Sequence, residues 1–129
     1  MQIADLSPIR RHNLDARAVG WLGTDAFYKG AVPTDLLDRL TKLVVFKSSF
    51  FGSRLHPCPL CGVERAEGRY DGAIRILGTA ELWIPDGQCW FASPNLLLHY
   101  ISAHGYCPPT EYLTALSVVN FDASRPPGR

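Results

Sequence analysis

Apolar residues recur at the three- and four-residue spacing of a helix over residues 35–45, which places them on one face. Thr34 precedes this segment, where its hydroxyl can cap the first turn. A second helix is predicted over residues 94–104, because Ser93 supplies a capping hydroxyl before a proline and Gly105 can end the helix in the left-handed conformation. We expect the leucine face of the first helix to pack in the core rather than to bind a partner.

Short runs of aliphatic and aromatic residues predict strands in the second half of the chain. These runs are residues 73–77, 80–84 and 88–91, and a Pro-Asp-Gly turn separates the last two. A third, short helix is predicted over residues 110–118, after a pair of prolines. Together these elements predict an α+β fold, in which a small three-stranded antiparallel sheet over residues 73–91 packs with three helices.

The distribution of polar sequence predicts one domain with polar ends. The chain has 129 residues, 47% of them apolar, which is enough to bury a core without disulfide bonds. Residues 1–18 are mostly polar, and we expect an irregular N-terminal arm there. The polar segment 122–129 contains two prolines and is expected to be a flexible tail. A single globular domain is therefore predicted over residues 19–121.

Charge and apolar run lengths limit the classes of partner and compartment. The 13 Lys and Arg residues nearly balance 12 Asp and Glu, so charge gives no reason to expect nucleic acid or an acidic membrane. No apolar run approaches the roughly 20 residues of a membrane helix, and the N-terminus lacks the apolar core of a signal peptide. We therefore expect a cytoplasmic protein with no membrane partner. In that compartment the four cysteines are expected to be thiols or metal ligands rather than disulfides.

Two cysteines and two histidines have the spacing of a zinc site. Cys58 and Cys61 are separated by two residues and followed by Gly62, which predicts a tight turn with converging thiolates. His99 and His104 lie near the end of the predicted helix, within the histidine spacing found in zinc-finger helices. Thiolate and imidazole ligands suit Zn²⁺ in a tetrahedron. These residues predict a zinc-knuckle or finger-like unit that stabilises the domain.

The other two cysteines leave the ligand set open. His104 and Cys107 have an equally good ligand spacing, and this pair would leave His99 to pack in the core. Cys107 is therefore an alternative ligand. Cys89 stands alone on a predicted strand, and we interpret it as a small buried hydrophobic residue.

Four protein ligands leave no coordination position for water, so the zinc is predicted to be structural. This favours a non-enzymatic protein in which zinc supports a protein-interaction or adaptor role. The expected partner is another protein.

Nucleic-acid binding is the first alternative. Basic residues in segments 10–17 and 42–54, with aromatic side chains such as Trp21, could form a stacking surface. However, 37 residues separate Cys61 from His99, against roughly 12 in DNA-reading fingers. We expect the aromatic residues to lie in the core.

A thiol or metal enzyme is the second alternative. It needs a reactive cysteine or an open metal position, and a cysteine nucleophile would meet its histidine base only in space. A thioredoxin-like motif should open a helix, whereas Gly62 and a charged loop follow Cys61. The sequence also lacks a phosphate-binding glycine loop, an H-E-x-x-H motif and a serine elbow.

Four segments taken together resemble a known family. They are Val19–Leu22, Cys58–Gly62, Ala80–Pro85 and His99–Pro109. In this order they are similar to a family of small, uncharacterised bacterial proteins with a C-P-x-C-G and H-x-x-x-x-H set. The resemblance spans about Val19 to Leu113. It implies an intracellular bacterial protein with a zinc-type Cys/His set, and it implies no activity.

Overall fold

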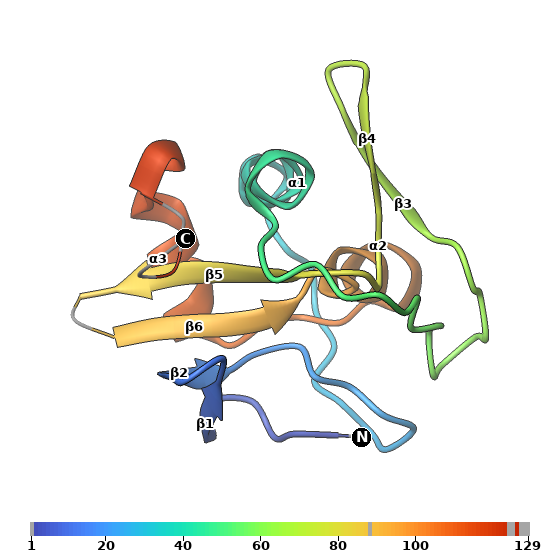
Figure 1. Ribbon diagram of the computed structural model, residues 1–129, viewed down its shortest axis with the longest axis horizontal. Helices are drawn as coiled ribbons and strands as arrows, with labels where there is room; N and C mark the ends of the chain where they lie inside the picture. Colours follow the sequence, from blue (N-terminus) through green and yellow to red (C-terminus); the bar gives the residue numbers. More distant parts are fainter. Residues whose placement is uncertain (1, 88, 124–125, 127–129) are drawn as a thin grey trace.

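The computed structural model describes residues 2–87, 89–123 and 126. Most of the flexible tail expected over 122–129 lies outside these residues. The elements, in chain order, are β1 (Pro8–Arg11), β2 (Leu14–Ala18), α1 (Thr34–Lys47), β3 (Glu67–Tyr70), β4 (Ala73–Ile76), β5 (Glu81–Asp86), β6 (Cys89–Pro94), α2 (Leu97–His104), α3 (Thr110–Val118) and a short 3-10 turn, η1 (Phe121–Ala123). The fold is α+β, and α1, α2 and α3 correspond to the predicted helices (Figure 1).

The predicted three-stranded antiparallel sheet is wrong. The main sheet has four strands in the order β1-β2-β6-β5, and β2 and β6 run parallel while the other pairs are antiparallel. β4 pairs instead with β3 in a separate two-stranded sheet that projects from the molecule (Figure 1). The reason is the turn at Asp71 and Gly72, whose φ values of 49° and 81° suit a type I′ hairpin turn. This turn pairs β4 with the segment before it.

The irregular arm expected over residues 1–18 contains a β-hairpin. β1 and β2 are joined at His12 and Asn13, both with positive φ, at 55° and 64°. A His-Asn pair is a weak turn signal compared with Asn-Gly or Asp-Gly, which is why this hairpin was not predicted from the sequence. β2 then pairs with β6, where Ala18 lies opposite Ala92. The N-terminal segment is thus part of the main sheet.

The main core lies between the helices and one face of the sheet. The leucine face of α1 is buried, as predicted, with Leu40, Leu43 and Val44 at most 1% exposed. The second helix begins at Leu97 rather than at residue 94, because β6 continues through Pro94. A smaller cluster around Trp83, Ala16 and Ala92 is covered by the β1–β2 hairpin. No helix among the described residues is long and apolar enough to cross a membrane.

Candidate metal centre

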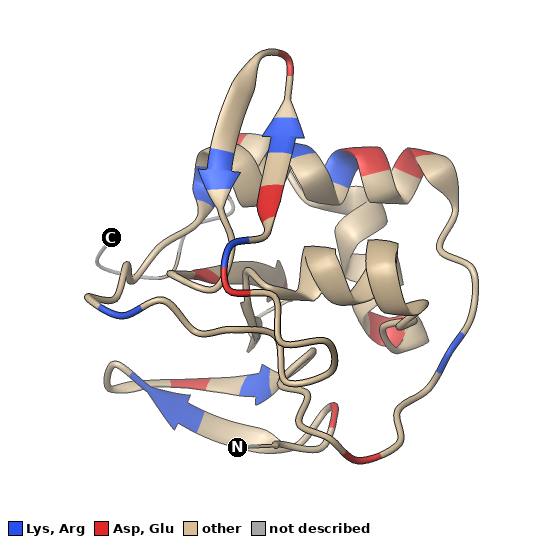
Figure 2. Cartoon of the chain, turned by 90° about the vertical axis from the view of Figure 1, so that its right-hand side faces the viewer, with Lys and Arg blue, Asp and Glu red and all other residues tan. Residues whose placement is uncertain are grey.

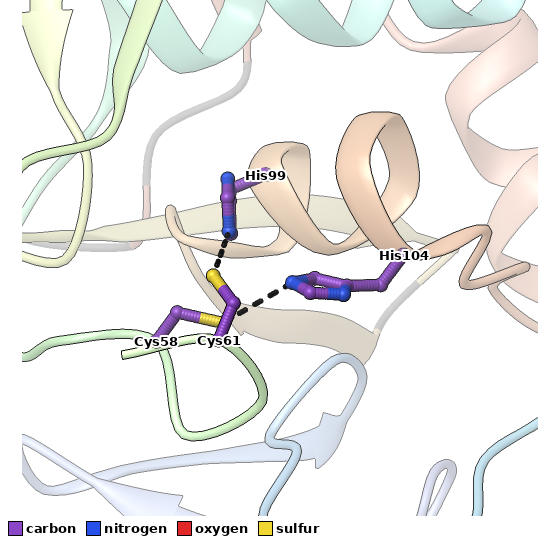
Figure 3. A group of neighbouring side chains, drawn as sticks. All are labelled: Cys58, Cys61, His99 and His104. Atoms are coloured by element: carbon purple, nitrogen blue, oxygen red, sulfur yellow. Dashed lines mark hydrogen bonds between the residues drawn. The ribbon is translucent and has the colours of Figure 1, made fainter. Parts of the chain in front are cut away.

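Cys58, Cys61, His99 and His104 converge at one point. One ligand atom from each lies within 4.8 Å of those of the other three. Cys58 Sγ is 3.5 Å from His104 Nε2, and Cys61 Sγ is 3.5 Å from His99 Nε2 (Figure 3). The group is therefore close enough to hold a metal ion, with the cysteines on a loop and the histidines on α2.

A tight turn positions the cysteine side chains. The Gly62 N–H donates to the Cys58 carbonyl at 2.8 Å, and Gly62 has a φ of 76° that favours glycine. The Cys58 N–H in turn donates to the Val63 carbonyl at 3.0 Å, which closes the loop on itself. The Leu60 N–H points at Cys58 Sγ, at 3.4 Å. An N–H donor of this kind stabilises negative charge on sulfur, as a metal-bound thiolate requires.

The histidines reach the cluster from the end of α2. His104 is five positions after His99, an offset of about 140° around an ideal helix, so regular geometry alone would not direct both at one point. His104 is the last residue of α2, and Gly105 ends the helix with a φ of 70°. The ring centroids of His99 and His104 are 5.1 Å apart and nearly perpendicular. Placing one histidine at the end of the helix lets the two rings converge.

A close backbone contact holds the cysteine loop against the rest of the fold. The His56 N–H donates to the Gly78 carbonyl at 3.0 Å, two residues before Cys58. The Gly78 N–H donates to Oδ1 of Asn95, which is fully buried, at 2.8 Å. A Cβ atom at Gly78 would lie 2.4 Å from the His56 carbonyl oxygen. Gly78 is therefore required for this approach, and Asn95 fixes its position.

Protonation in the cluster depends on burial and on neighbouring groups. Burial raises the pKa of the Cys58 thiol, although the backbone N–H groups of Cys61 and Leu60 lower it in part. Burial, and then the nearby His104, lower the pKa of His99. A neutral His99 offers a lone pair to a metal. Binding to Cys58 as a thiolate would release a proton.

Comparison with known protein families identifies one family that matches this chain. Residues 1–117 match the model of the family described as Domain of unknown function (DUF7919). The chain belongs to the DUF7919 family. The match begins before Val19 and ends after Leu113, so it covers the whole segment on which the sequence resemblance rests. Neither the curated proteins nor the solved structures give a match.

The remaining cysteines of the DUF7919 chain lie outside the cluster. Cys107, the alternative ligand, is not part of the group and directs its Sγ at the Pro108 carbonyl, at 3.6 Å. Cys89 was expected to be buried, but it is exposed, and that prediction is wrong. It is the first residue of β6 and lies opposite Asp86, the last residue of β5, at the end of the pair where the chain passes from one strand to the other.

A buried ionic network in the DUF7919 fold was missed at the sequence level. Glu81 is 6% exposed, and its Oε2 accepts hydrogen bonds from Arg11 Nε and Nη2 at 3.0 and 2.6 Å. His12 Nε2 is 3.0 Å from the same oxygen, and Trp83 Nε1 donates to Oε1 at 3.0 Å. Burial alone would raise the pKa of Glu81, but these partners outweigh it and lower the pKa. Arg11 and His12 lie about 70 residues from Glu81 in the chain, and no local motif connects them.

Charged side chains are distributed rather than gathered. Figure 2 shows Lys or Arg together with Asp or Glu on the β1–β2 hairpin, on the β3–β4 hairpin and on α1, where the two acidic residues precede the three basic ones. Arg10 pairs with Asp15, and Arg17 pairs with Asp86, so much of the basic charge in the N-terminal hairpin is locally balanced.

Proposed function

We propose that this DUF7919 protein is a non-enzymatic zinc-binding protein whose metal has a structural role. The observation that carries the proposal is the convergence of Cys58, Cys61, His99 and His104 within 4.8 Å. The zinc would tie the cysteine loop to α2, and the stabilised domain would act as a protein-interaction module or adaptor. The reducing cytoplasm, the expected compartment, would keep both thiols available to the metal.

The distances between ligand atoms support zinc. Zn–S and Zn–N bonds of about 2.3 and 2.0–2.1 Å in a tetrahedron place a sulfur and a nitrogen about 3.6 Å apart. Both Cys–His pairs lie at 3.5 Å. Two sulfur and two imidazole ligands are also the donor set that Zn²⁺ prefers over oxygen-seeking cations such as Mg²⁺. Each of these two pairs therefore already has the separation of two ligands on one zinc ion.

The closed donor set supports a structural rather than catalytic metal. Four protein ligands fill the tetrahedron, so no position remains for water or substrate. Cys58 is 1% exposed, which shields one side of the site. Zinc in such sites contributes about 10–16 kcal/mol of apparent binding energy, compared with about 5–15 kcal/mol for the stability of a whole domain. The metal can thus decide whether the domain is folded.

A protein partner is favoured over nucleic acid by the charge distribution. The formal net charge is +1, and acidic residues interrupt the basic ones on both hairpins (Figure 2). Affinity for nucleic acid depends on many cationic contacts with phosphates. We expect no complex with DNA or RNA in a gel shift at low salt, and a salt-sensitive complex would contradict this part of the proposal.

The decisive experiment measures zinc per chain on protein purified without chelator. We expect one zinc in the wild type and loss of zinc in Cys58→Ser and His99→Ala. Cys107→Ser and Cys89→Ser are matched controls, because both thiols lie outside the cluster, and they should keep the metal. Absence of zinc in the wild type, or its loss in a control, would contradict the proposed ligand set.

Thiol labelling separates this proposal from a thiol enzyme. In zinc-loaded protein, Cys89 should react at once because it is exposed, whereas Cys58 and Cys61 should react only after a chelator is added. Cys61 is the informative residue, since it is exposed and only a bound metal would protect it. Rapid labelling of Cys61 before chelation would argue for a reactive thiol.

A further inference from the structure

A cavity of about 570 Å³ lies beside the cysteine loop. Its walls come from the turn of the β1–β2 hairpin, the segment around Trp21, the loop 50–59, the turn before β5, and the start of α2. Its volume lies within the range of about 300–1,000 Å³ that small-molecule sites occupy. None of the four clustered Cys and His residues lines it, so the cavity is a separate feature.

The polar end of the cavity holds a fixed guanidinium group. Both Nε and Nη2 of Arg11 donate to Glu81 Oε2, and the guanidinium lies 4.3 Å above the Trp21 ring centroid. Glu81 and Trp21 thus fix Arg11 from two sides. Within the part of the chain that the structure describes, Arg11 Nη1 makes no hydrogen bond, which leaves the end of the guanidinium for a further acceptor. Nη1 and Nη2 together match the two oxygens of a carboxylate.

Glu81 itself is not a ligand for a cation. Its side chain is 7% exposed, and Oε2 is within hydrogen-bond distance of both Arg11 and His12. Trp83 occupies Oε1. The lowered pKa of Glu81 means that it is a carboxylate near neutral pH, where it balances the charge of Arg11 and keeps it in place. An anionic ligand in the cavity can therefore accept hydrogen bonds from the oriented guanidinium of Arg11. A cationic ligand would find the carboxylate oxygens of Glu81 already hydrogen-bonded within the protein.

Most of the other residues that line the cavity are apolar. Trp21 is held by a hydrogen bond from its Nε1 to the Ala92 carbonyl, at 2.9 Å. Phe50 stacks on His12 with ring centroids 3.7 Å apart and planes 2° from parallel. Phe50 also has a φ of 55°, a left-handed conformation that is unusual for a bulky residue and is commonly retained at functional sites. Leu96 and Tyr100, from the start of α2, also line the cavity.

We propose that this cavity binds a small aromatic carboxylate. The carboxylate would accept hydrogen bonds from Arg11, and the ring would pack against Trp21 and the apolar wall from α2. The proposal does not rest on the metal, because the binding groups lie outside the Cys/His cluster. Zinc content measured on the same samples will distinguish failure of one proposal from failure of the other.

The test is calorimetric titration of the purified full chain with 2-naphthoate and with its uncharged analogue 2-naphthamide. We expect one naphthoate per chain, bound roughly tenfold or more tightly than the amide, because hydrogen bonds between charged groups are worth more than neutral ones. In NMR spectra of the same protein, the resonance of the Trp21 indole N–H should shift when naphthoate binds. Equal affinities for the two compounds, or no binding at millimolar concentration, would overturn the proposal.

Three variants locate the binding groups. Arg11→Lys keeps a cation beside Glu81 but loses the paired donors, so it should weaken naphthoate roughly tenfold and leave naphthamide unchanged. Arg10→Lys is the matched control on the same strand; Arg10 does not line the cavity, and neither affinity should change. Gly52→Leu should weaken both compounds by filling the cavity, since a Cβ there meets no atom closer than 3.7 Å. Naphthoate binding that survives both Arg11→Lys and Gly52→Leu would place the site elsewhere.

Discussion

Gly78 is the position where one added methyl group would act most directly on the cysteine loop. Its φ is 88°, and a Cβ atom there would lie 2.4 Å from the carbonyl oxygen of His56. The obstacle is backbone, so it cannot be relieved by rotating a side chain. Because His56 lies two residues before Cys58, relief of the overlap must displace the loop that carries both cysteines. Gly78→Ala should therefore weaken both the fold and the metal site.

The cost can be worked from two contributions. The left-handed conformation costs a residue with a Cβ about 1–2 kcal/mol. Forcing an extra methyl group into a packed contact costs about 1–3 kcal/mol more. We expect Gly78→Ala to lose about 2–5 kcal/mol of unfolding free energy, a large part of the roughly 5–15 kcal/mol of a typical domain.

Gly72→Ala is the matched control. Gly72 has a φ of 81° but no atom within 4 Å of the added Cβ, so only the strained backbone conformation should destabilise Gly72→Ala. Urea unfolding of both variants, at equal zinc concentration, should give about 1–2 kcal/mol for Gly72→Ala and a larger loss for Gly78→Ala. Competition with a chelator should remove zinc more readily from Gly78→Ala than from Gly72→Ala.

Equal losses for the two variants would refute the reasoning. That result would mean that the His56 backbone does not approach Gly78 as closely as the structure places it. If Gly78→Ala retained zinc as well as the wild type despite a large loss of stability, the contact between Gly78 and His56 would stabilise the fold without positioning the metal ligands.

The remaining predictions concern buried polar groups and the metal. Glu81 has a lowered pKa in the fold, so its stabilisation is present above the ordinary glutamate pKa and is lost as pH falls through the folded-state value. Glu81→Gln should therefore have a lower melting temperature than the wild type at neutral pH, and its melting temperature should fall less as the pH is lowered. An equal fall in both proteins on the acid side would contradict this. Asn95→Leu should cost about 1–3 kcal/mol in urea unfolding, because it leaves the Gly78 N–H without its acceptor; an Asn95→Leu variant as stable as wild type would show that water replaces the amide. A chelator should lower the melting temperature of the wild type but not that of Cys58→Ser, which lacks a proposed ligand; an equal drop in both would show that the chelator acts elsewhere.

Local patterns carried most of what could be predicted from the sequence about the candidate site. The spacing of Cys58 and Cys61, and that of His99 and His104, indicated a common centre before any tertiary contact was known. These pairs can be recognised in the sequence because a single turn positions the two cysteines and a single helix end positions the two histidines. The sequence left Cys107 as an alternative, since a ligand spacing cannot show which residues meet in space. In the fold, it is His99 that lies at the cluster.

The helices were predictable for the same local reason, and the strand partners were not. An amphipathic repeat over 35–45 specifies both the helix and the face that it buries. A run such as 73–77 specifies an extended segment but not the strand beside it, because backbone hydrogen bonds are nearly the same for every sequence. The local turn at Asp71 and Gly72 paired β4 with β3, whereas tertiary packing joined β2 to β6.

By itself, then, the sequence determined the helices and five ligand candidates: Cys58, Cys61, His99, His104 and Cys107. Only the tertiary structure decided which of these candidates meet, the pairing of β2 with β6, and the contact between Arg11 and Glu81, 70 residues apart. A buried ion pair leaves no periodic signal, since each member is an ordinary charged residue in its own segment. Burial costs the pair its hydration, and the attraction of the partner and the hydrogen bonds offset that cost; both the burial and the partner exist only once the chain has folded.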